Sequence, residues 1–271
     1  MTESAAGPRV PAPLIEANLA TAEDIARLLR AHPDPAAAIP GARWTVGEAA
    51  AHLVLANALM ADLARGLDRP YGDGTPAGLA AANDDGLADY PERDPRVLAD
   101  ALVAHTRDYA EQAAARAADE PVDTPMGPMD QGTLASYLLT HQLGHGYDLA
   151  RALRQPHMVD SARVVHAVPF LLRAMPRVVD PTTAARLDAR FAVNLRGGPR
   201  FWVSVAGGTA TVSEQPPAHR PDCTIMAEPV SFFLLALGRR STAQAVLTGS
   251  IVAWGRKPWL APRFASAFRA P

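Results

Sequence analysis

Residues 132–152 are the stretch that most limits how this chain can fold, because a helical pattern there places two histidines where core residues belong. Apolar residues recur at helical spacing, and His141 and His145 continue the same stripe, with Asp148 one turn later. Residues three and four apart lie on one face of a helix. A polar group buried without a partner destabilises a fold by about 1–3 kcal/mol. The fold must therefore bring partners to this face, and a shared metal ion is one candidate.

The chain has 271 residues, which exceeds the usual size of one simple core, so we expect two domains, 1–155 and 156–271. The net charge is −2 and the basic residues are scattered, which argues against a nucleic-acid partner. One cysteine, Cys223, excludes an internal disulfide and suits a reducing compartment. Without a signal-like segment or a long apolar run, we expect a cytoplasmic protein with no membrane partner, either a monomer or a homodimer.

Helical patterns in the first half predict an antiparallel four-helix bundle. They cover residues 14–31, 45–67, 94–117 and 132–154. The second begins with a Thr45-x-x-Glu48 capping box, and Trp44 is placed to act as its hydrophobic staple. His52 lies in this helix beside the inward stripe. Residues 69–93 are rich in Gly, Pro, Asp and Asn and predict a long loop of the kind that often shapes a site, and 119–131 predict an irregular connector.

The second half has a different pattern, typical of strands followed by short helices. Alternating residues predict strands at 190–195, 200–205, 209–212 and 222–226, with glycine pairs marking the turns. Helical patterns near 229–237, 241–248 and 257–268 follow, with a short strand near 249–254. The expected fold class is therefore α+β: a helical bundle followed by a smaller α+β domain.

Three histidines from two distant helices are candidate metal ligands: His52, His141 and His145. Three protein ligands that leave one position open are typical of catalytic zinc, and Asp148 is placed to orient one imidazole. Spacing alone leaves the alternative open, because histidines four apart are common on helix surfaces and a single inward histidine is usually a hydrogen-bonded core residue.

The sequence also resembles a known family. TrpThrValGlyGluAlaAlaAlaHisLeu (44–53) and LeuThrHisGlnLeuGlyHisGlyTyrAspLeuAla (139–150) resemble the DinB-type metal-binding bundle and, more closely, the mycothiol-dependent maleylpyruvate isomerase family. The resemblance implies metal-ligand roles for His52, His141 and His145. Three further segments resemble that family's C-terminal domain, which is related to sterol carrier proteins: 222–229, 235–240 and 246–250.

The resemblance implies a divalent metal ion, with zinc expected, and mycothiol as cofactor or cosubstrate. His52 and Asp148 are expected to be catalytic, and so is Arg239, as a clamp for a substrate carboxylate. Arg239 at a solvated helix end is the equally open alternative. His141 stands where the isomerase is expected to have glutamate. Three neutral histidines leave the full +2 charge of the metal, which favours an anionic thiolate and leaves the specific reaction open.

The thiol is expected to bind beside the metal. Tyr147 and Arg151 are the candidates on the fourth helix, and Asn83 is the candidate in the 69–93 loop. A coordinating thiol loses its proton, so the expected function is S-transfer to a small electrophile or thiol-assisted isomerisation. A metal-dependent hydrolase and a non-catalytic small-molecule-binding protein remain alternatives.

Overall fold

The computed structural model describes residues 7–269. The chain divides into two compact units, and the boundary in the sequence lies between Val159 and Asp160. The first unit is mainly helical and the second combines a sheet with helices. The expected fold class is therefore confirmed.

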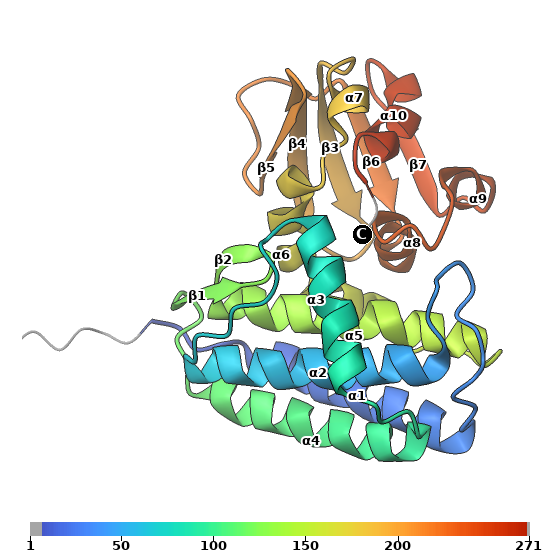
Figure 1. The fold of residues 1–271 in the computed structure, drawn as a ribbon. Coiled ribbons are helices and arrows are strands. Elements are labelled where there is room, and N and C mark those ends of the chain that lie inside the picture. The colour runs from blue at the N-terminus through green and yellow to red at the C-terminus, as the bar shows by residue number, and fades with distance from the viewer. Residues whose placement is uncertain (1–6, 270–271) are drawn as a thin grey trace, which may run out of the picture. The chain divides into compact units, whose positions relative to one another are not determined.

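Four long helices form the bundle of the first unit (Figure 1): α1 (Ala12–Ala31), α2 (Val46–Arg65), α4 (Pro95–Ala114) and α5 (Gln131–Ala152). Helix α4 packs against α1 and α2, and α5 packs against the same two. Helices α2 and α4 run in the same direction, since Arg116, just beyond α4, donates to the Ala64 carbonyl at the end of α2. Helices α2 and α5 run antiparallel, so the start of α2 meets the later turns of α5.

The start of α2 is fixed by the capping box that the sequence predicts. The Glu48 backbone N–H donates to Thr45 Oγ1, and the Thr45 N–H donates to the Glu48 carboxylate at 2.8 Å. Trp44 packs, partly buried, against the bundle core. Helix α2 is also long and apolar enough, by composition alone, to cross a membrane, but most of it is buried inside this unit, as in the core helix of a bundle.

The predicted loop at 69–93 is wrong, because its centre is a helix, α3 (Pro76–Asp89). Thr75 caps α3 by accepting from the Gly78 N–H, and Tyr71 Oη donates to Asn83 Oδ1 at 2.6 Å. An ion pair joins Arg43 to Asp84. Helix α3 lies across the long helices and contacts α2 (Figure 1). The connection of residues 66–94, which contains α3, returns the chain to the other end of the bundle, so α2 and α4 run parallel.

The predicted irregular connector at 119–131 is also more regular than expected. It contains a short antiparallel hairpin, β1 (Pro121–Thr124) and β2 (Gly127–Asp130). Gly127 has φ +85°, which glycine adopts without strain. The hairpin contacts α5, and β1 also contacts α2.

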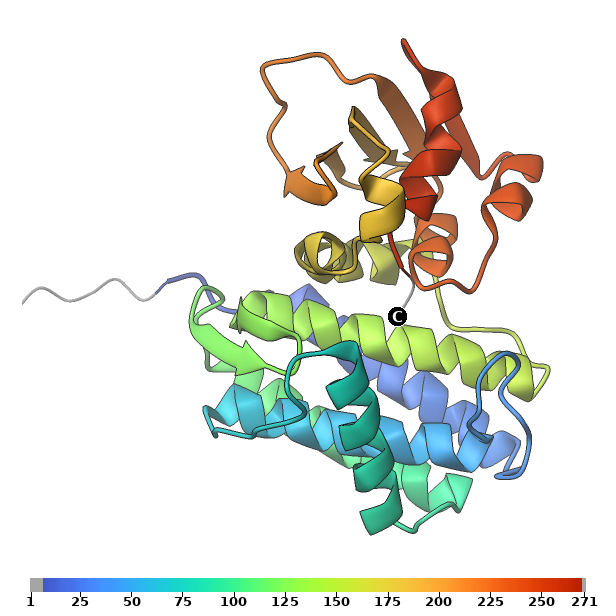
Figure 2. The same ribbon diagram turned by 45° about the horizontal axis from the view of Figure 1, so that its top comes forward.

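The second unit is built on a five-stranded sheet (Figure 2). The strands are β3 (Ala189–Leu195), β4 (Arg200–Ala206), β5 (Thr209–Ser213), β6 (Cys223–Ala227) and β7 (Ile251–Trp254), in the order β5-β4-β3-β6-β7. Only β3 and β6 pair in parallel. The helical elements are α6 (Ser161–Ala174), η1 (Met175–Arg177), α7 (Pro181–Ala184), α8 (Pro229–Ala236), α9 (Thr242–Leu247), η2 (Pro258–Leu260) and α10 (Ala261–Ser266).

Alternation along the strands buries one face of the sheet. Phe191 and Phe201 are fully buried on that face. Their rings contact Phe264 of α10 at 5.0 Å and Phe232 of α8 at 5.8 Å, between centroids. These aromatic contacts hold the helices against the sheet.

Candidate metal centre

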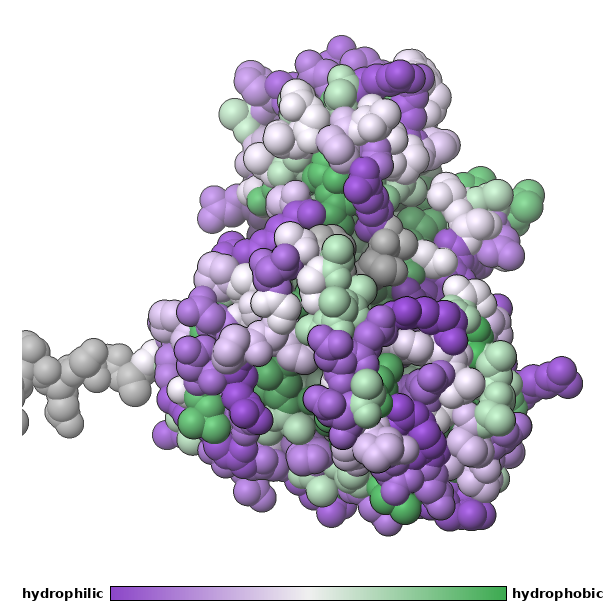
Figure 3. Space-filling model, viewed as in Figure 1, coloured by the Kyte–Doolittle hydropathy of each residue, from purple (hydrophilic) through white to green (hydrophobic). Residues whose placement is uncertain are grey.

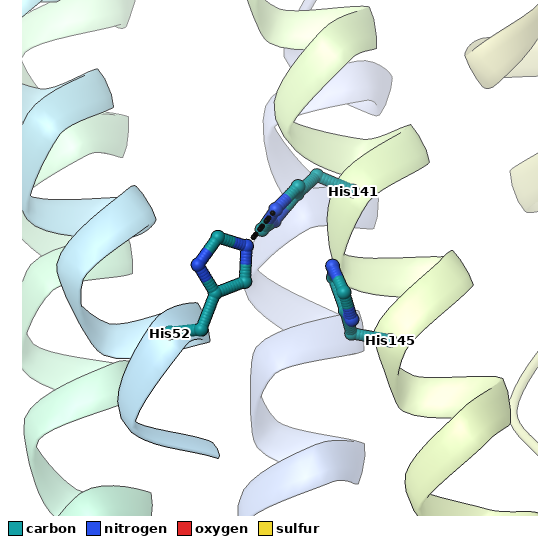
Figure 4. A group of neighbouring side chains, drawn as sticks. All are labelled: His52, His141 and His145. Carbon is teal, nitrogen blue, oxygen red and sulfur yellow. Dashed lines mark hydrogen bonds between the residues drawn. The ribbon is translucent and has the colours of Figure 1, made fainter. Parts of the chain in front are cut away.

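The structure brings His52 of α2 together with His141 and His145 of α5 (Figure 4). One ring nitrogen from each lies within 4.8 Å of the other two. Nε2 of His52 and Nε2 of His141 are 2.9 Å apart, a hydrogen-bond distance. The antiparallel packing of α2 on α5 therefore joins residues that are far apart in the sequence.

Burial sets the protonation of this group. The His52 side chain is only 6 % exposed, while His141 and His145 are half-buried. Burial lowers the pKa of His52 from 6.5 to about 4. His52 is therefore neutral at pH 7, and neutral imidazole is the form that binds metal ions.

The three side chains fit a tetrahedral metal ion. Zinc binds imidazole nitrogen at about 2.0–2.1 Å, so two ligand nitrogens in a tetrahedral site lie about 3.3 Å apart. The His52 and His141 nitrogens are 2.9 Å apart, and no two ligand nitrogens of the group are more than 4.8 Å apart. These distances bracket about 3.3 Å, so small side-chain rotations would bring the three nitrogens to tetrahedral spacing. Among the described residues, this group of potential ligands holds three histidines and no carboxylate. Imidazole nitrogens suit zinc, copper, iron and nickel, and do not suit magnesium or calcium.

Trp44 forms one wall of the centre, a role that the sequence analysis missed. Its ring lies 4.8 Å from His52 and 6.0 Å from His145, centroid to centroid, and is stacked on His145 with an interplanar angle of 30°. Trp44 directly precedes the cap of the helix that carries His52. The sequence therefore placed Trp44 close to His52, but the sequence analysis gave Trp44 only the role of a hydrophobic staple.

Two tyrosines were also missed: Tyr137, which lies near His141, and Tyr71, which interacts with Tyr137. Tyr137 is one turn before His141 on the same face of α5, and its ring is perpendicular to His141 at 6.5 Å. Burial raises the pKa of Tyr137 to about 12, and Tyr71 adds to that rise. Because Tyr71 donates to Asn83 Oδ1, this group also includes the predicted thiol-binding residue of α3. The four-residue spacing of Tyr137, His141 and His145 was the sequence signal that places Tyr137 on the histidine face.

Tyr147 and Arg151, the other two predicted thiol-binding residues, belong to a separate group on α5. The guanidinium carbon of Arg151 lies 5.8 Å from the Tyr147 ring centroid, and that ring contacts His157 at 5.1 Å. Tyr147 is two residues after His145, so helical geometry points it toward a different face. The structure does not bring this pair to the histidines, and their thiol-binding role stays a prediction.

The remaining predicted residues are placed as follows. Asp148 is half-buried on the histidine face of α5, one turn after His145. Arg239 belongs to the second unit, in the segment that follows α8. Its catalytic role and the orienting role of Asp148 stay predictions.

A buried polar network lies behind the centre. Asn57 Oδ1 of α2 accepts hydrogen bonds from Thr106 Oγ1 of α4 at 2.9 Å and from Gln142 Nε2 of α5 at 2.8 Å. All three side chains are fully buried. Hydrogen bonds in such an interior are directional, so they fix how the three helices face one another.

Comparison with protein families supports this organisation. Residues 19–150 match the mycothiol maleylpyruvate isomerase N-terminal domain, and residues 172–255 match the SCP-2 sterol transfer family. All three histidines lie within the first match. No curated protein matches the sequence.

A solved structure that covers most of the chain has a similar fold. The crystal structure of the mycothiol-dependent maleylpyruvate isomerase is 11 % identical with a TM-score of 0.50, and the match covers 89 % of this chain and 91 % of that one. A UbiJ-SCP2 ubiquinone synthesis protein is 18 % identical, and that match covers 38 % of this chain and 91 % of the other at a TM-score of 0.30. This chain therefore joins a mycothiol maleylpyruvate isomerase N-terminal domain to a domain of the SCP-2 sterol transfer family.

Proposed function

We propose that this protein is a metal-dependent enzyme that uses a low-molecular-weight thiol, with mycothiol expected, to isomerise or S-conjugate a small electrophile. The observation that carries the proposal is the convergence of His52, His141 and His145 inside the part of the chain that matches the mycothiol maleylpyruvate isomerase domain. The metal-binding role of the three histidines is part of this proposal.

The chain's own residues supply a defined set of functions. The three histidines would hold a divalent metal ion, with zinc expected, and the Trp44 ring packs against one side of His52 and His145. A metal ion held there would keep a bound thiol in its thiolate form at neutral pH, which is the nucleophile that attack on an electrophilic carbon needs. Because the ligands are neutral, the site keeps the ion's +2 charge and favours an anionic sulfur.

The tyrosine group near the centre suits a polar thiol. Tyr71, Tyr137 and Asn83 offer hydroxyl and amide groups, which are the groups that hydrogen-bond to a hydroxyl-rich cofactor. We assign Asn83 to thiol binding, Asp148 to orienting an imidazole, and Arg239 to holding a substrate carboxylate.

The first test combines metal analysis with activity. The full chain should contain about one equivalent of zinc or a similar ion, and H52A, H141A and H145A should each lose most of it. The matched control is H105A, which removes a histidine of the same bundle outside the group. A wild-type protein purified without metal, and unable to bind it on titration, would contradict the proposal.

The second test separates the possible reactions. Mycothiol and maleylpyruvate are supplied together and separately, and a panel of electrophiles is screened by mass spectrometry for thiol adducts. Turnover that needs added thiol and disappears in H52A supports the proposal. Metal-dependent turnover without thiol would identify a hydrolase instead, and ligand binding without metal or turnover would identify a binding protein.

A further inference from the structure

The C-terminal end of the chain has an unusual charge. Residues 229–271 contain six basic residues and no Asp or Glu: Arg239, Arg240, Arg256, Lys257, Arg263 and Arg269. The whole chain carries −2, so the rest of it carries a net charge of −8. The sequence therefore concentrates positive charge in this segment. Two of the six residues pair with acids outside it, Lys257 with Asp222 and Arg269 with Asp180.

The same segment exposes large apolar side chains. Leu247 is 86 % exposed and Trp259 is 67 % exposed, with Val246 at 54 %, Trp254 at 45 % and Val252 at 44 %. Among the described residues, only two other large apolar side chains are exposed to a similar degree, Leu67 and Val97, both in the helical unit. Single exposed apolar residues are ordinary, but five within fourteen residues of sequence indicate a binding surface.

These side chains lie on three elements that contact one another in succession. Helix α9 contacts the edge strand β7, and β7 contacts η2. Hydrophobic atoms are visible at the surface over α9 (Figure 3). Arg240 holds this region together, because its guanidinium donates to Ser231, Thr248 and Ser250. We call the exposed side chains of α9, β7 and η2, together with the exposed Arg256 and Arg263, the α9–η2 surface.

Charge decides what can cover this surface. A two-fold contact of this surface with the same surface of a second copy would place basic residues against basic residues, and like charges in an interface are unfavourable. The partner must instead be anionic and must also accept apolar side chains. An anionic lipid bilayer offers both, since tryptophan is favoured at its interface and basic residues are attracted to its negative headgroups.

We propose that the α9–η2 surface attaches the protein peripherally to an anionic bilayer. The expectation of no membrane partner came from the lack of a spanning segment, and peripheral attachment needs none. Leu247 and Trp259 would enter the interface while Arg256 and Arg263 contact phosphate groups. This inference does not depend on the metal centre.

The test is cosedimentation of the full chain with vesicles of phosphatidylcholine alone or mixed with phosphatidylglycerol. We expect binding only to the anionic vesicles, weakened by added salt. The double variant R256Q/R263Q should lower the partition coefficient at least tenfold, because each basic residue near such a surface contributes about fivefold. L247S/W259S should also lower it about tenfold.

Matched controls keep the test specific. R186Q/R220Q removes two exposed arginines of the same unit, and L67S removes an exposed leucine of the bundle. Both should bind within about twofold of wild type, and circular dichroism should show that every variant is folded. No binding to anionic vesicles at low salt would overturn the proposal. So would equal loss in the controls, or a dimer in light scattering that L247S/W259S dissociates.

Discussion

Acidification should destabilise the metal-free protein through His52. The pKa of His52 is about 4 in the folded protein and about 6.5 in the unfolded chain. Above pH 6.5 both states are neutral at this position, so His52 adds no pH dependence. As the pH falls below 6.5 the unfolded chain takes up a proton that the folded protein does not, and stability is lost down to about pH 4.

The size of the effect follows from the two pKa values. One unit corresponds to about 1.4 kcal/mol, so the loss between pH 7.5 and pH 4.5 is about 2.5 kcal/mol and approaches about 3 kcal/mol near pH 4. Carboxylates with lowered pKa values act in a lower window. Asp180, whose pKa is about 2 because the Thr183 N–H and Arg269 hydrogen-bond it, loses its contribution mainly below pH 4. The two effects are therefore separable.

The assay is urea unfolding of the chelator-treated protein, followed by helical circular dichroism at a series of pH values. H52Q should remove most of the pH dependence between 7.5 and 4.5, whereas H105Q, a control on α4, should keep it. An equally steep dependence in H52Q, or a His52 pKa near 6.5 by NMR in the native protein, would refute the reasoning. Adding zinc should stabilise the wild type by about 2.7 kcal/mol at one hundred times its dissociation constant.

Three further outcomes are expected. W44L should weaken zinc binding about tenfold and change the visible spectrum of the cobalt-substituted protein, whereas W44F should do so much less, because Trp44 orients two of the three histidines. Y71F removes the 2.6 Å hydrogen bond to Asn83, so amide exchange in α3 should accelerate about fivefold while zinc affinity is unchanged. The fully buried Cys223, whose thiol pKa is raised by burial, should react with a disulfide reagent at least a hundredfold more slowly in the native than in the unfolded protein; an equal rate would contradict the burial.

The parts of the fold predicted from sequence are those where local and tertiary signals agree. Helix α2 has both a capping box and an apolar stripe, and the strands β3 and β4 alternate because one face of the sheet is buried. Helix α3 was missed because it has no clear apolar stripe and contains Gly78 and Gly86. Thr75 followed by Pro76 is a helix-start signal, but the Gly, Pro, Asp and Asn content of residues 69–93 favoured the loop prediction.

Site residues were predictable where angle and spacing were both used. His141, His145 and Asp148 share a face of α5 by spacing alone, and bringing the two histidines to His52 needed only two packed helices. Tyr147 was placed near the site by closeness in sequence, although two residues correspond to about 200° around a helix. Arg239 illustrates another limit, because the pattern of its own segment does not show what its guanidinium binds.

Helix rotation connects the buried polar network to the metal centre. His141 and Gln142 are consecutive, so their side chains point about 100° apart, one to the histidine group and one to Asn57. The Gln142 hydrogen bond therefore fixes the rotation of α5 about its axis, which sets where His141 and His145 point. Thr106 bonds to the same Asn57 oxygen but belongs to α4, which carries none of the three histidines.

Substituting each of the two donors separates rotation from stability. Q142M and T106V each remove one donor to Asn57 Oδ1 and leave the other, so each should lower the free energy of unfolding by about 1–2 kcal/mol. Only Q142M releases α5, so only Q142M should weaken zinc binding, by about three- to tenfold in a chelator competition. A zinc affinity unchanged from the wild type in both variants would show that helix packing alone positions the histidines. A loss in T106V as large as that in Q142M would instead show that the network acts through stability, since Thr106 lies on α4 and the hydrogen bond it accepts from Gln142 Nε2 is long, at 3.3 Å.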